Sequence, residues 1–182
     1  MWHVDYWDYL GWKDPFASKA WTDRQKACVK AIQSKQTYTP MLVAAGTHNS
    51  NIDAIKQAAE KMLAEEQSIT LALTAKLAGG KITLSATTKK LKELPAGTKL
   101  FAAIAEDGLV TKCTAAENKG RELHEGSVAR ALGEPKDVAD KVSWTIAVDA
   151  KWNVAKLRAV VFAQDPSSWK VLEAAQTIVP PK

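Results

Sequence analysis

The sequence predicts an α+β chain, in which a partly helical N-terminal half precedes an antiparallel β-sandwich. Two observations carry this prediction. Apolar residues recur at steps of three and four before residue 66, and the period changes to two after it. Alternating segments separated by turn residues then follow one another at short spacing, which is typical of a sandwich. We therefore predict two domains, residues 1–66 and residues 67–182.

The N-terminal half is predicted to contain one strand and two helices. Met1–Trp7 alternates apolar and polar residues, which favours a strand. A first helix is predicted from Thr22, because Thr22 and Gln25 have the spacing of a capping box. A second helix is predicted over residues 52–63, where apolar residues line one side and charged residues the other.

The C-terminal half is predicted to be built from strands that each have one solvent-exposed face. Gly79–Gly80 separates the first two of them and predicts a hairpin turn. The segments that alternate, or form short apolar runs, are residues 69–77, 82–86, 100–105, 142–148, 157–163 and 171–178.

The composition is that of a globular protein, since 46% of the 182 residues are apolar and 25% are charged. No apolar run reaches the ~18 residues of a membrane span, so no transmembrane segment is expected. Residues 1–66 hold eight basic and eight acidic side chains, so the net charge of +5 comes from the rest of the chain. The excess is almost all lysine, and we expect no nucleic-acid binding. Cys28 and Cys113 form neither a disulfide framework nor a zinc motif, and their spacing leaves a single bridge open.

The segment from His3 to Phe16, HVDYWDYLGWKDPF, is long and rich in rare aromatic residues. It resembles the signature of an uncharacterised, mostly secreted, thioredoxin-like family that is classed as a domain of unknown function. Further similarities follow in order along the chain: Arg24–Gln25, Tyr38–Thr39–Pro40, Leu109–Val110–Thr111, Glu117–Asn118–Lys119–Gly120–Arg121, Val128 with Arg130, and Val161–Phe162–Ala163–Gln164. The resemblance implies a thioredoxin-like first half, with Pro40 as its cis-proline, and export or an organelle as the location; the chain shows no signal sequence of its own.

The sequence also departs from that family. Members open with an additional strand and a helix that carries a Cys-x-x-Cys pair, and this sequence lacks both. The first half is therefore expected to be a truncated, degenerate thioredoxin-like segment. Because its sheet would lack a central strand, its backbone groups would have to be covered by a protein partner or by a second copy of the chain.

Aromatic residues near the N-terminus are the candidate interaction residues. They fit either a hydrophobic core or a face that binds a partner. The candidates are Trp2, Tyr6, Trp7, Tyr9, Trp12, Phe16, Tyr38, Thr39 and Pro40.

No catalytic residue, cofactor or metal is predicted. The favoured hypothesis is a redox-inactive structural or protein-interaction subunit of a larger assembly. One alternative is a thiol-disulfide oxidoreductase-like protein that uses Cys113 and Cys28. The other is a ligand- or metal-binding β-sandwich. Separately, His3 and Asp5 share one face of the predicted first strand with Asp8 near, and such a set of hard ligands is a weak metal candidate.

Overall fold

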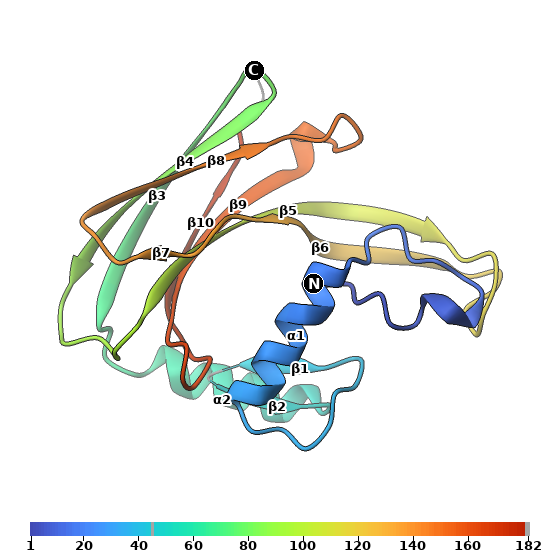
Figure 1. Cartoon of the computed structure of the whole chain (residues 1–182), viewed down its shortest axis with the longest axis horizontal. Helices are drawn as coiled ribbons and strands as arrows, with labels where there is room; N and C mark the ends of the chain where they lie inside the picture. Colours follow the sequence, from blue (N-terminus) through green and yellow to red (C-terminus); the bar gives the residue numbers. More distant parts are fainter. Residues whose placement is uncertain (45, 181–182) are drawn as a thin grey trace.

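The computed structural model describes residues 1–44 and 46–180 (Figure 1). Its helices are η1 (Asp8–Leu10), α1 (Lys19–Ala31), α2 (Ile52–Leu63) and η2 (Val154–Lys156). Its strands are β1 (Leu42–Ala44), β2 (Thr47–Asn49), β3 (Ile69–Ala78), β4 (Lys81–Lys90), β5 (Lys99–Lys112), β6 (Glu122–Leu132), β7 (Lys136–Asp137), β8 (Lys141–Ala147), β9 (Leu157–Gln164) and β10 (Val171–Ile178).

Two antiparallel sheets make up most of the molecule (Figure 1). One has the strand order β3-β4-β8, and the other has the order β10-β9-β5-β6, with β7 paired to one end of β5. Gly79 and Gly80 join β3 to β4 with positive φ angles, as a tight hairpin turn requires. The fold is β-rich.

Side chains from both sheets share one core. In β4 the alternation is strict, because Ile82, Leu84 and Ala86 are buried while the residues between them are exposed. The buried members of the core are Ile69, Ile82, Leu84, Ala86, Leu100, Ala102, Ile104, Trp144, Ile146, Leu157, Ala159, Val161, Ala163 and Val179.

The strands β5 and β9 form fuller apolar runs because helix α1 covers the outer face of their sheet. Phe101 of β5 and Phe162 of β9 stack on that face, with ring centroids 5.2 Å apart and planes at 11°. Arg24 of α1 lies over both rings and donates a hydrogen bond from Nη2 to Oε1 of Gln164, at 3.1 Å. A strand that is covered on both faces loses the polar half of its alternation.

The N-terminal predictions are wrong at two points. Met1–Trp7 does not form a strand; it is irregular and leads into η1. Helix α1 begins at Lys19 and is capped by Ser18, not from Thr22. The Thr22 hydroxyl is engaged elsewhere, because it donates to Oδ1 of Asp5 at 2.6 Å and accepts from the Asp5 amide. A local capping motif cannot anticipate that contact.

The predicted thioredoxin-like half is also wrong. The structure has 42% of its residues in strands and 17% in helices, arranged in three sheets. In the described part of residues 1–66, the strands are the three-residue pair β1 and β2, which form a small antiparallel hairpin.

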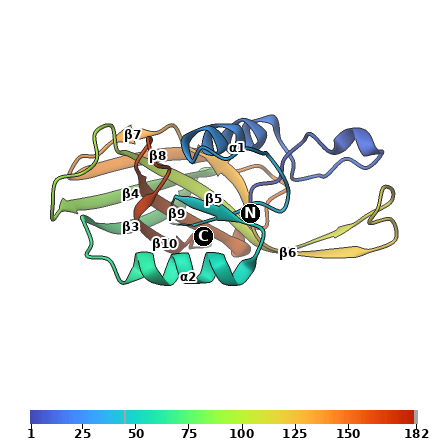
Figure 2. The same cartoon turned by 90° about the horizontal axis from the view of Figure 1, so that it is seen from below.

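The predicted second helix is confirmed as α2. The Asn51 side chain caps it by accepting from the amides of Asp53 and Ala54. None of its residues is fully buried, and it lies along one side of the molecule, apart from α1 (Figure 2). The boundary between residues 66 and 67 falls between α2 and β3 and stays a prediction. In the ranges that the structure covers, every helix is too short or too polar to cross a membrane.

Candidate interaction surface

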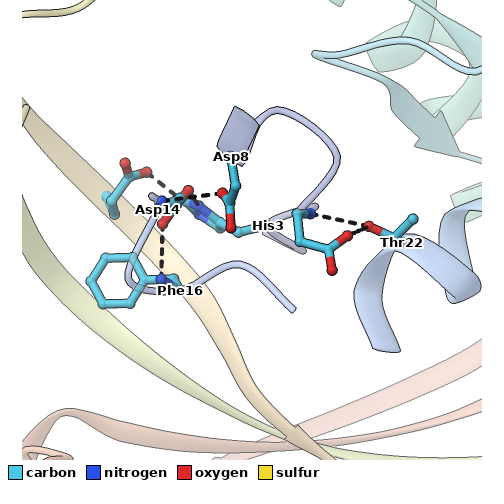
Figure 3. Close-up of polar contacts among 7 residues, drawn as sticks. His3, Asp8, Asp14, Phe16 and Thr22 are labelled. Carbon is cyan, nitrogen blue, oxygen red and sulfur yellow. Dashed lines mark hydrogen bonds and ion pairs between the residues drawn. The ribbon is translucent and has the colours of Figure 1, made fainter. Parts of the chain in front are cut away.

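Polar contacts hold the N-terminal segment in a defined loop. His3 donates from Nδ1 to Oδ2 of Asp14 at 2.6 Å, which ties the two ends of the loop together (Figure 3). Asp14 in turn accepts from the amide of Phe16 at 2.8 Å, and its own amide donates to Asp8. The loop closes without regular structure because side chains satisfy its backbone groups.

His3 lies between two acidic side chains. Its Nε2 is 3.9 Å from Oε2 of Glu125 on β6, and this nitrogen is buried without a hydrogen-bond partner among the described residues. Burial alone would raise the pKa of Asp14, but hydrogen bonds from His3 and the Phe16 amide, with the charge of His3, hold that pKa below its usual value. The bond that anchors this segment to β6 is a backbone one, in which the Ala129 amide donates to the Met1 carbonyl at 2.8 Å.

The three hard ligands proposed from the sequence, His3, Asp5 and Asp8, each bind a different partner. His3 is hydrogen-bonded to Asp14, Asp5 accepts from the Thr22 hydroxyl, and Asp8 accepts from the Asp14 amide. Within residues 1–44 and 46–180, no group of three His, Cys, Asp or Glu side chains could hold a metal ion.

Three large apolar side chains stand out from this loop. Trp7, Tyr9 and Leu10 are 44%, 76% and 49% exposed, and we call them the aromatic ridge. The Trp7 and Tyr9 rings lie 6.4 Å apart with planes at 31°. Trp7 Nε1 donates to Oγ1 of Thr39 at 2.9 Å, so the ring is fixed although it is exposed.

Segment 38–40 contacts the aromatic ridge through the hydrogen bond between Thr39 and Trp7. Gln25 of α1 accepts from the Tyr6 hydroxyl at 3.0 Å and donates to the Tyr38 carbonyl at 2.9 Å. Thr39 and Pro40 are exposed beside Trp7, and the peptide bond between them is cis. These candidates are therefore brought together on one surface.

The remaining candidates pack against other side chains of the fold, although Trp2 stays 38% exposed. Trp2 lies edge-on to the buried Trp21, with ring centroids 4.7 Å apart. Phe16 packs edge-on to His3, and Trp12 is half-buried. Some of the aromatic candidates therefore pack within the fold, and others are exposed on its surface.

The sequence analysis missed two arginines, Arg24 and Arg130, that link the N-terminal segment to the sheet containing β6 and β9. Arg24 lies over four aromatic rings, and Arg130 lies 5.2 Å from the Phe16 ring and 5.6 Å from the Trp152 ring. Arg130 Nε is also 3.4 Å from Oε2 of the buried Glu106. Both arginines stand at positions that carry the family resemblance, which was the signal available.

Both cysteines are buried and free, so no bridge joins them. Burial raises the pKa of the Cys28 thiol, and the neighbouring charge of Arg24 only partly opposes this. Cys113 follows β5, and its backbone pairs with Arg121 and Gly120 across the hairpin.

These features define a β-rich chain whose N-terminal loop presents aromatic side chains. The chain belongs to the family described as "Protein of unknown function (DUF1223)", whose model matches residues 1–164. The expectation of an uncharacterised family is confirmed, and its implied thioredoxin-like half is overturned by the sheets described above. Among curated proteins, none matches this chain.

Two solved structures are similar over most of the chain. Protein AGR_C_4864 from Agrobacterium tumefaciens is 18% identical with a TM-score of 0.66, and the match covers 100% of this chain and 80% of that one. HBP35 of Porphyromonas gingivalis is 14% identical with a TM-score of 0.64, over 89% of this chain and 60% of that one. At these identities the likeness extends to the fold alone.

Proposed function

We propose that this chain is a non-catalytic, redox-inactive protein-interaction subunit that binds a protein partner through the aromatic ridge. The carrying observation is the exposure of Trp7, Tyr9 and Leu10 side by side on one loop. Tryptophan and tyrosine dominate the binding energy of protein interfaces, where truncating a central ring costs about 2 kcal/mol or more.

The order of the loop supports the proposal. Binding through a flexible loop loses affinity to the entropy of ordering it. Here the loop is already held by His3 and Asp14, and the Trp7 ring by Thr39. A partner would therefore bury rings that are already in place.

The state of the cysteines disfavours the thiol-enzyme alternative. A thiol-disulfide enzyme needs an accessible thiol with a lowered pKa. Cys28 is buried with a raised pKa, and Cys113 is 3% exposed.

Site-specific crosslinking tests the proposal. A photoreactive phenylalanine replaces Tyr9 in one variant and Leu63, on α2 and 80% exposed, in a matched control. We expect position 9 to crosslink one defined protein in cells and position 63 to crosslink none or a different set. Equal crosslinking from both positions would contradict a partner surface at the ridge.

A further inference from the structure

Arg24 differs from Arg130 and Arg158, each of which lies beside a carboxylate. Arg158 Nη2 is 2.8 Å from Oδ2 of Asp107, which also accepts from Nε. No carboxylate of the described residues lies within 4.0 Å of Arg24, and its one hydrogen bond goes to the neutral Oε1 of Gln164. Arg24 is thus a half-buried cation without a counter-charge in the part of the chain that the structure describes.

Four aromatic rings surround the Arg24 guanidinium, and we call this group the Arg24 cage. Its carbon lies 5.1 Å from the ring centroids of Trp2, Phe101 and Trp169, and 5.5 Å from that of Phe162. Ring faces stabilise the positive charge. They do not replace oxygen acceptors for the five N–H donors, which lie in the guanidinium plane.

The Arg24 N–H groups without a partner are not fully buried. In the described residues, the buried polar side-chain atoms without a partner belong to His3, Glu106 and Thr111, and none belongs to Arg24. Trp2, which forms one wall of the cage, is 38% exposed. An anion that approaches beside the Trp2 ring can therefore accept hydrogen bonds from the unpaired N–H groups of Arg24.

We propose that the Arg24 cage is a binding site for a carboxylate carried on an apolar body. The planar guanidinium matches the two oxygens of a carboxylate. The indole rings of Trp2 and Trp169 offer apolar contact area to the group that bears the carboxylate. This site is separate from the aromatic ridge and does not depend on the function proposed for it.

A titration followed by nuclear magnetic resonance tests the proposal on the whole chain. The chain has four arginines, so its arginine Nε–H signals are few, and the Arg24→Lys variant identifies the one from Arg24. Benzoate is the probe, benzamide its neutral counterpart, and inorganic phosphate an anion without an apolar body. We expect benzoate to shift the Arg24 signal with a Kd of about 1–10 mM. Benzamide and phosphate should bind at least about tenfold more weakly, and the Arg158 signal should stay in place.

Substitution of Arg24 is a second test of the proposed carboxylate site. Arg24→Lys keeps the charge but loses the planar fork, so benzoate affinity should fall at least about tenfold, whereas Arg121→Lys at an exposed position should leave it unchanged. If circular dichroism shows that Arg24→Lys is unfolded, the comparison of benzoate with benzamide on the unsubstituted chain still tests whether the site binds a carboxylate. An Arg24 signal that benzoate does not move, or that benzamide or phosphate moves equally, overturns the proposal.

Discussion

Single polar side chains determine the course of the N-terminal segment. Thr22 bonds Asp5, and His3 bonds Asp14, so hydroxyl, imidazole and carboxylate groups replace the backbone pairing that a strand would have provided. These contacts join residues 11 and 17 positions apart, which explains why local alternation misled the strand prediction. The pKa of the Asp14 carboxylate is lowered in the fold, so this group makes the stability of the loop sensitive to acid.

Substituting Asp14 should make the chain less sensitive to pH. The pKa of Asp14 is lowered in the folded state, so the carboxylate stabilises the fold above the unfolded value of about 3.9, and this contribution disappears as the pH falls through the folded pKa. We expect Asp14→Asn to lower the free energy of unfolding by about 1–3 kcal/mol at pH 7 and by progressively less as the pH falls below the unfolded pKa. Urea unfolding of both proteins across this range measures the difference. A difference that does not change with pH would contradict this account of Asp14.

The two thiols should react slowly in the folded protein. Cys28 and Cys113 are buried, and burial raises the pKa of Cys28. We expect modification by a thiol reagent at pH 8 to be at least about tenfold slower than in the urea-unfolded chain. Native cysteines that react as fast as unfolded ones would restore the thiol-enzyme hypothesis.

The elements of this chain differ in how much they depend on packing. Helix α2 has a capping asparagine and an amphipathic pattern but no fully buried residue, whereas β4 places Ile82, Leu84 and Ala86 in the core. Local signals therefore define α2, and burial defines β4.

One substitution in each element tests this contrast. Ile82→Ala in β4 should lower the free energy of unfolding by about 2–5 kcal/mol, because it leaves a cavity in the core. The same change at Ile55 of α2, which is half-buried, should cost less than about 1 kcal/mol. Chemical denaturation measures both, and equal losses would show that α2 packs more closely than described.

Elements with a strong local pattern could be predicted, and those set by distant contacts could not. The alternation in β4 and the periodicity of residues 52–63 survive in the structure because one face of each differs from the other. The start of α1 was misplaced because Thr22, the apparent cap, is bonded to Asp5, 17 residues earlier. The Arg24 cage was not foreseen at all, since its rings come from four separate parts of the chain.

The molecule as a whole combines a β-rich body with an N-terminal segment that is attached to it by specific contacts. The body has its own core in two sheets, and Arg24 and Arg130 hold the segment against one of them. The ridge of Trp7, Tyr9 and Leu10 is the exposed part of this segment that takes no part in these attachments. We therefore propose this ridge as the surface that a protein partner covers.

The decisive measurement is the affinity of a ridge variant for the purified partner that crosslinking identifies. Trp7→Ala combined with Tyr9→Ala should weaken binding by at least about 100-fold, because two central rings are lost. Leu63→Ser, at a comparably exposed site on α2, should leave the Kd unchanged. Calorimetric titration of the three proteins gives the comparison, with circular dichroism to verify that each is folded. A folded ridge variant that binds its partner as tightly as the unsubstituted chain would contradict the account.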